Sequence, residues 1–208
     1  GQKVNPSPIE NFCKKNKLNF YYQKNLNNLE ELNIFKKISP DIVIVVAYGQ
    51  IIPKSFLEIP RLGFINIHAS LLPKWRGAAP IQRAIMNKDK KIGVSIMKIE
   101  EKLDTGPVLA SIELQLDENV THGEMERYLA VKGADLLVKS LNDIISGNSE
   151  FLNQTDSEAT YAKKIKKNET KINWNLNASK VLAHIHSLSP NPGAWFEYEK
   201  ERFKILKA

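Results

Sequence analysis

A run of β-branched apolar residues constrains the fold of this chain most strongly. Residues 41–49 read D-I-V-I-V-V-A-Y-G, an uninterrupted apolar segment closed by a glycine. A segment of this kind is typical of a strand that is buried on both faces of a parallel sheet. Helices are predicted on either side of it, at residues 28–38 and 53–57. The pattern therefore predicts a fold in which strands alternate with helices.

The same alternation continues along the chain and sets the fold class. Further strands are predicted at residues 64–68, 93–99 and 108–114, and further helices at 8–17, 80–86, 119–145 and 177–188. Thr121 and Glu124 have the spacing of a capping box at the start of the longest helix. We expect an α/β protein with a Rossmann-like, parallel-type sheet, flanking helices and right-handed crossovers.

The composition changes after Gly147 and indicates a second region. Residues 160–180 carry six lysines and one glutamate, and residues 194–206 read as two strands around a charged turn. We expect a catalytic-type domain at residues 1–150, a basic linker at 151–187 and the start of another domain at 188–208. The chain begins with glycine and ends within a predicted strand, so we expect it to be a piece of a longer protein.

Charge and cysteine usage narrow the class of function. The formal net charge is +7 and the isoelectric point is about 9.3, which favours a polyanionic partner such as nucleic acid. One cysteine, Cys13, excludes a disulfide scaffold and a cysteine-rich zinc site. The longest aliphatic stretch, residues 42–47, is far shorter than the ~20 residues of a membrane helix. No secretory signal precedes it, so we expect a cytoplasmic protein without a membrane partner.

Two polar clusters are candidates for chemistry. Asn66 and His68 alternate along one predicted strand, so their side chains face the same way near its carboxyl end. Asp104 lies in the loop segment L-D-T-G-P. Each residue alone also fits a structural role, as a turn former or a satisfied polar core residue. His184 and His186 are two apart on a predicted helix and make a poor metal pair; no metal site is expected.

Several segments together resemble the folate-dependent formyltransferases. They are residues 44–53 (I-V-V-A-Y-G-Q-I-I-P), 66–85 (N-I-H-A-S-L-L-P-K-W-R-G-A-A-P-I-Q-R-A-I), 93–98 (G-V-S-I-M-K), 103–109 (L-D-T-G-P-V-L) and 191–194 (N-P-G-A). The family's opening strand–helix–strand unit, with its G-T-P-x-F motif, is absent. The strands after Gly193 resemble the start of its C-terminal barrel, an OB-like fold.

The resemblance implies an activity and its partners. A formyl group would pass from 10-formyltetrahydrofolate to the α-amino group of methionyl-initiator tRNA, in support of translation initiation, without a metal. The continuation W-R-G-A-A-P-I-Q favours the tRNA-modifying branch of the family. A sugar-amine N-formyltransferase and a non-catalytic RNA-binding fragment remain alternatives. We expect the protein to act as a monomer.

The resemblance also implies roles for particular residues. Asn66 and His68 would stabilise the negative charge on the formyl oxygen or accept the amine proton, and Asp104 would favour the imidazolium and fix its tautomer. Folate would contact Ser70, Leu71, Leu72 and Pro73, and also Tyr48, Gly49, Gln50 and Ile51. The tRNA would contact Arg76, Lys163, Lys164, Lys166 and Lys167. For Arg76 the alternative is a clamp that stabilises the turn, and for the lysines it is a solvated linker.

Overall fold

The structure is a computed structural model that describes residues 6–23 and 25–208. The chain forms two compact units, Gly1–Ile38 and Ser39–Ala208. The first unit contains α1 (Pro8–Asn16) and α2 (Leu29–Ile38), which confirms the two helices predicted there. Ser7 caps α1 by accepting a hydrogen bond from the backbone N–H of Glu10. The tail of the family's basic loop, residues 1–8, lies largely outside the described residues.

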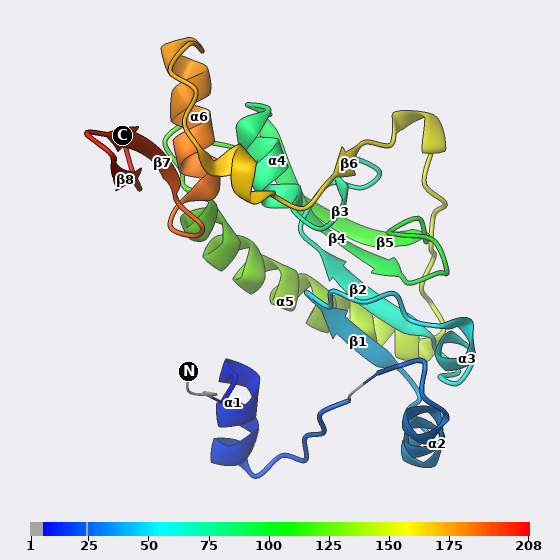
Figure 1. Cartoon of the computed structure of the whole chain (residues 1–208). Coiled ribbons are helices and arrows are strands. Elements are labelled where there is room, and N and C mark those ends of the chain that lie inside the picture. The colour runs from blue at the N-terminus through cyan, green and yellow to red at the C-terminus, as the bar shows by residue number, and fades with distance from the viewer. Residues whose placement is uncertain (1–5, 24) are drawn as a thin grey trace. The chain divides into compact units, whose positions relative to one another are not determined.

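Every strand and the remaining helices of the described residues lie in the second unit (Figure 1). The strands of its main sheet are β1 (Val43–Val46), β2 (Phe64–His68), β4 (Lys91–Lys98) and β5 (Val108–Gln115). Its helices are α3 (Lys54–Leu57), α4 (Pro80–Met86), α5 (His122–Ser146) and α6 (Ala178–Leu188). Two short pairs complete it: β3 (Arg76–Gly77) with β6 (Tyr161–Ala162), and β7 (Ala194–Tyr198) with β8 (Glu201–Ile205). The pair β3–β6 has no signal in the sequence pattern.

The main sheet confirms the α/β class, and it is a mixed sheet. Its strand order is β1-β2-β4-β5, with β1 parallel to β2 and the other neighbours antiparallel. The short connection between β4 and β5 forces those two strands to run in opposite directions. The expectation that residues 41–49 form a strand buried on both faces is wrong. In this chain β1 is an edge strand, and Ile44 and Val46 are 36% and 60% exposed.

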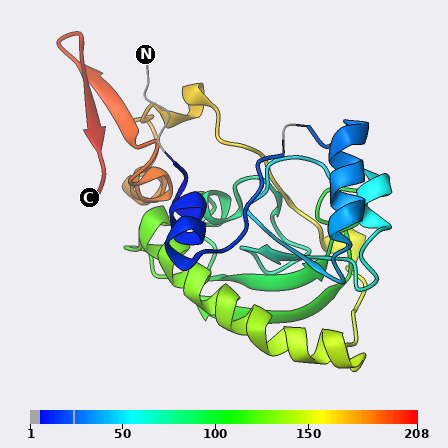
Figure 2. The same ribbon diagram turned by 90° about the horizontal axis from the view of Figure 1, so that it is seen from below.

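Helix α5 covers one face of the main sheet (Figure 2). Ile65 and Ile96 of the sheet pack in one core cluster with Leu137 and Ile144 of α5. The helix approaches the sheet closely at Gly133, where an added Cβ would lie 2.8 Å from Cγ2 of Ile67. The predicted capping box is confirmed, and it fixes where α5 begins relative to the sheet. The opposite face of the sheet carries Asn66 and His68, and loops pack against it.

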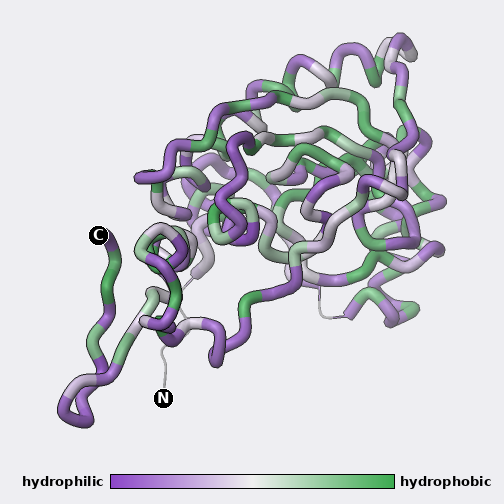
Figure 3. Tube along the Cα trace, turned by 90° about the horizontal axis from the view of Figure 1, so that it is seen from above, coloured by the Kyte–Doolittle hydropathy of each residue, from purple (hydrophilic) through white to green (hydrophobic). Residues whose placement is uncertain are grey.

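The C-terminal part packs through α6. Ile185 and Leu188 of α6 join Ile172 and Ala194 in a separate buried cluster. The two predicted strands after Gly193 are confirmed as the hairpin β7–β8, whose tip is hydrophilic (Figure 3). The OB-like continuation and the three-part division of the chain remain predictions. In the described residues, no helix is long and apolar enough to cross a membrane.

Candidate active site

Strand β2 presents two polar side chains on one face of the sheet. Asn66 pairs in register with Val45 and Met97, and His68 pairs with Ser95. Asn66 is half-buried, and its side-chain amide has no hydrogen-bond partner among the residues that the structure describes. His68 is buried, with only 6% of its surface exposed. The pair therefore combines an available amide donor with a desolvated imidazole, as the alternation along the strand predicts.

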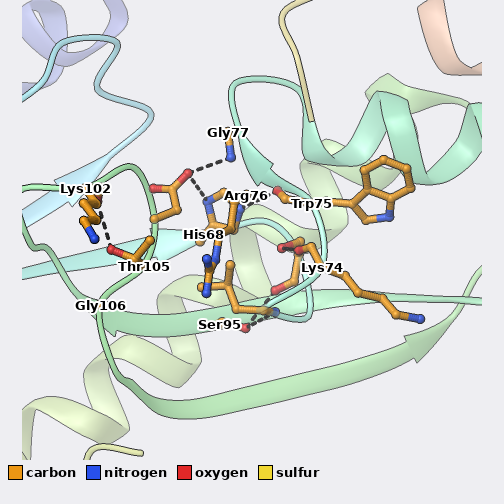
Figure 4. A network of polar contacts seen from close by, with 12 residues as sticks. His68, Lys74, Trp75, Arg76, Gly77, Ser95, Lys102, Thr105 and Gly106 are labelled. Carbon is orange, nitrogen blue, oxygen red and sulfur yellow. Dashed lines mark hydrogen bonds and ion pairs between the residues drawn. The ribbon is translucent and has the colours of Figure 1, made fainter. Parts of the chain in front are cut away.

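The backbone near His68 determines which nitrogen of the ring carries the proton. Nε2 of His68 lies 2.9 Å from the carbonyl oxygen of Trp75 (Figure 4). A carbonyl oxygen can only accept a hydrogen bond, so Nε2 carries the proton and Nδ1 is the nitrogen free to accept another. Nδ1 lies 3.8 Å from Oδ2 of Asp104, within ion-pair range but beyond hydrogen-bond distance. The Trp75 carbonyl, rather than Asp104 as expected, therefore sets the neutral tautomer.

Asp104 reaches His68 from the loop between β4 and β5. Its Oδ2 accepts a hydrogen bond from the backbone N–H of Gly77 at 2.7 Å, and its side chain is only 17% exposed. Asp104 and Trp75 both adopt left-handed backbone conformations, with φ of +52° and +61°. Such conformations cost about 1–3 kcal/mol in most non-glycine residues and persist only where the surrounding structure holds them. The site is thus built on two strained turns.

Trp75 is held in its left-handed conformation from two sides. Its backbone N–H donates to Oγ1 of Thr160, and its indole N–H donates to Oδ2 of Asp89 at 2.7 Å. Gly77 pairs with Ala162 in the short ladder β3–β6. Sequence reasoning identified neither Thr160 nor Asp89. Thr160 lies far from Trp75 in sequence and Asp89 lies in an ordinary polar turn, so only the fold brings them to the site.

The loop of Ser70, Leu71, Leu72 and Pro73 follows β2 and is seated on β4. The hydroxyl of Ser95 donates to the carbonyl of Ser70 and accepts from the N–H of Leu72. Leu71 packs where a side chain at Gly93 would be, because an added Cβ would lie 2.5 Å from its Cδ2. The Ser70 hydroxyl itself donates to the Lys74 carbonyl. Ser70 therefore shapes the loop and has its hydroxyl proton committed within the chain.

The segment after β1 lies at the same end of the sheet as His68. Val46 at the end of β1 pairs in parallel with Ile67, so the residues that follow it emerge beside the end of β2. Tyr48 and Ile51 are 39% and 74% exposed. An added Cβ at Gly49 would meet nothing within 4 Å, so the backbone there is open. This segment, Tyr48, Gly49, Gln50 and Ile51, thus offers an exposed, partly apolar surface and accessible peptide groups beside the face of the sheet that carries Asn66 and His68.

Arg76 is buried, unlike the four lysines that the resemblance names with it as contacts of the tRNA. Its side chain is 2% exposed, and its guanidinium donates to Oε1 of Gln154 and Oδ1 of Asp156. This burial favours the clamp over a contact with nucleic acid. The four lysines of the linker are exposed: Lys163, Lys164, Lys166 and Lys167. Their segment is attached to α4 by Arg83, which donates to the Lys163 carbonyl and pairs with Glu169 at 2.7 Å.

Two of the other three histidines, His184 and His186, contact backbone carbonyls, whereas Nδ1 of the buried His122 has no hydrogen-bond partner among the described residues. Nε2 of His184 lies 2.7 Å from the carbonyl of Glu169, and His186 is fully buried with both nitrogens near carbonyl oxygens. In the described part of the chain, no group of three or more histidine, cysteine or acidic side chains has the arrangement of a metal site.

Two family models match the chain, and together they cover most of it. The model described as formyl transferase matches residues 2–141, and the model described as formyl transferase, C-terminal domain, matches residues 164–208. Curated relatives named methionyl-tRNA formyltransferase match the whole chain. The protein of Pelagibacter ubique is 46% identical over 209 residues, and that of Dictyoglomus thermophilum is 44% identical over 209 residues. The chain spans 67% of the length of each.

Solved structures share the fold at lower identity. A sugar N-formyltransferase from Shewanella superposes with a TM-score of 0.75 at 23% identity, over 89% of this chain and 76% of that one. HypX from Aquifex aeolicus, solved with tetrahydrofolic acid, superposes with a TM-score of 0.73 at 18% identity, over 88% of this chain and 31% of that one. At these identities the likeness concerns the fold alone.

Proposed function

The chain belongs to the formyl transferase family, and we propose that it transfers a formyl group from 10-formyltetrahydrofolate to the α-amino group of methionyl-initiator tRNA. The carrying observation is that Asp104, which lies in the loop between β4 and β5, comes within 3.8 Å of His68 on the face of the sheet that also carries Asn66. The curated relatives at 41–46% identity are all named for this acceptor. In the same proposal the enzyme acts in the cytoplasm as a monomer.

The residues present fit the formyl donor. A flat pterin is bound by apolar side chains together with peptide groups that can hydrogen-bond its edge, and the segment of Tyr48, Gly49, Gln50 and Ile51 offers both. The loop from Ser70 to Pro73 borders the same face and is rigidly seated on Ser95. When bound, the donor supplies a formyl carbon that an amine can attack. We assign these two segments to hold it, with Ser70 acting through its backbone and its effect on the loop.

Asn66, His68 and Asp104 then have different roles in the transfer. The free amide of Asn66 donates a hydrogen bond to the formyl oxygen as negative charge develops there, a contribution typically worth about 10²–10³ in rate. Nδ1 of His68 accepts a proton from the attacking amine, because Nε2 is already protonated and held by the Trp75 carbonyl. Asp104 stabilises the positive charge that His68 acquires. His68 then returns this proton to the donor nitrogen as the bond between that nitrogen and the formyl carbon breaks, so that the formyl group stays on the amine.

The exposed lysines form a surface for the tRNA backbone. Lys163 and Lys164 have their carbonyls held by Arg83, so their side chains project from a fixed segment rather than a free linker. Preorganised cations lose less entropy on binding phosphates than mobile ones. We propose that Lys163, Lys164, Lys166 and Lys167 contribute salt-dependent affinity, whereas Arg76 acts within the fold.

An acceptor competition tests the assignment. The protein is supplied with 10-formyltetrahydrofolate and a mixture of methionyl-initiator tRNA and a nucleotide-linked amino sugar, and the formylated products are quantified. We expect the formyl group to accumulate on the methionyl-tRNA. Formylation of the sugar amine alone would favour the second branch of the family. Binding of tRNA without any transfer would favour the non-catalytic alternative.

A further inference from the structure

Gln154 connects the linker to the loop that carries Asp104. Its side-chain NH₂ donates two hydrogen bonds, to the carbonyl of Asp104 at 2.9 Å and to the carbonyl of Gly106 at 2.7 Å. Its Oε1 accepts a hydrogen bond from Nε of Arg76 at 2.9 Å. Only one orientation of the amide satisfies all three partners, since the flipped amide would oppose donor to donor and acceptor to acceptors.

Contacts of Leu152 and Arg76 hold Gln154 in place beside the loop of Asp104. Leu152 forms an isolated antiparallel bridge with Val108, and both of its backbone hydrogen bonds are present at 2.8 and 2.9 Å. This bridge fixes the linker along the start of β5, two residues before Gln154. On the other side Arg76, which is 2% exposed, fixes the amide oxygen. The amide therefore has little freedom to follow the loop if the loop moves.

The loop that Gln154 holds has a strained conformation. Asp104 has a φ of +52°. At Gly106 an added Cβ would lie 2.0 Å from the carbonyl oxygen of Lys98, so the loop backbone passes close to β4 and leaves no room for a side chain there. The hydrogen bonds of Gln154 bracket this strained turn at residues 104 and 106. A turn held against strain relaxes when such bonds are removed.

We infer that Gln154 is a positioning residue, which holds the carboxylate of Asp104 beside His68 through the backbone of its loop. The inference rests on the proposed function, in which Asp104 supports the charge on His68. Arg76 contributes by donating a hydrogen bond to Oε1 of Gln154, which orients the amide. A segment of the linker, outside the strands that carry the site, thereby sets the geometry of the catalytic carboxylate.

The tests use two variants of nearly the same shape. Gln154→Glu keeps an acceptor for Arg76 but turns an oxygen toward the two carbonyls, and Gln154→Met removes all three hydrogen bonds. Asn153→Ala, at the exposed neighbouring residue, is the matched control. We expect kcat to fall by about 10²-fold in both Gln154 variants, with KM values for donor and tRNA unchanged, because a misplacement of about 1 Å can cost that much. The control should match the unaltered protein.

A second readout does not depend on activity. The N–H of Gly77 donates to the Asp104 carboxylate, so its amide proton resonance in NMR reports where that carboxylate lies. We expect this resonance to move in both Gln154 variants as it moves in Asp104→Asn, and to stay in Asn153→Ala. An unmoved Gly77 resonance in folded Gln154 variants would overturn the inference, whatever their kcat. If Asp104→Asn itself left kcat unchanged, the proposed role of Asp104 would fail, and the Gly77 signal would still decide whether Gln154 positions it.

Discussion

Replacing Asp104 by asparagine isolates the charge of the carboxylate from its shape. The side chain keeps an oxygen that can accept the hydrogen bond from the N–H of Gly77, so the loop retains that anchor. What disappears is the negative charge 3.8 Å from Nδ1 of His68. The variant should therefore fold normally and should lose the stabilisation of the charged imidazole.

The expected size follows from the distance. Two unit charges about 4 Å apart interact by about 4 kcal/mol at an effective dielectric constant of ~20. Because each 1.36 kcal/mol is about tenfold in rate, this interaction is worth up to about 10³ in kcat. The Gly77 hydrogen bond neutralises part of the carboxylate's charge. We therefore expect a loss of about 10²–10³-fold.

The assay is single-turnover transfer of a labelled formyl group to methionyl-tRNA with saturating donor. Asp135→Asn, the same change on the exposed side of α5, is the control and should leave the rate unaltered. Urea unfolding of Asp104→Asn should match the unaltered protein. A folded Asp104→Asn variant within about threefold of the normal rate would refute the electrostatic reasoning.

Three further results are expected. Gly93→Ala should destabilise the fold by more than about 3 kcal/mol in urea unfolding, because the new methyl would lie 2.1 Å from a backbone oxygen of β5; an unchanged midpoint would contradict the tight seating of the loop. Replacing Lys163 and Lys164 by glutamine should lower the slope of log affinity for tRNA against log salt by about 2; an identical slope would favour a solvated linker. The guanidinium of Arg83, with a backbone N–H bond, lowers the pKa of Glu169 from 4.5 to about 2. The stability this gives is present above pH 4.5 and lost as the pH falls toward 2, so Glu169→Gln should flatten the pH dependence of unfolding in that window; an unchanged curve would contradict it.

Short-range patterns in the sequence predicted most of the helices and strands and the shared face of Asn66 and His68, whereas the candidate role of Asp104 came from the family resemblance. Alternation placed Asn66 and His68 on one face of β2, and capping chemistry placed the start of α5. The prediction that β1 is buried on both faces was wrong, because a hydrophobic run shows only that a strand could be buried. It does not report whether a second strand pairs with its other edge, and within the residues that the structure describes β1 has one neighbouring strand.

The supports of the site could not be read from the sequence. Thr160 and Gln154 act on residues 85 and 50 positions away, through the backbone of strained turns. Arg76 was predicted to contact the tRNA because it follows Lys74 and Trp75 in a loop rich in proline and glycine. Arg76 is buried because Gln154 and Asp156, which follow much later in the sequence, pack against it. No periodic pattern in the sequence predicts this contact. Side-chain type alone does not distinguish a solvated cation from a clamped one.

The central claim is that Asn66 and His68 meet the formyl carbon, and a structure of the protein with a stable analogue of 10-formyltetrahydrofolate tests it most directly. We expect the formyl oxygen to accept a hydrogen bond from the Asn66 amide, with Nδ1 of His68 facing the side from which the amine approaches. An analogue bound with its formyl group away from both side chains would contradict the account.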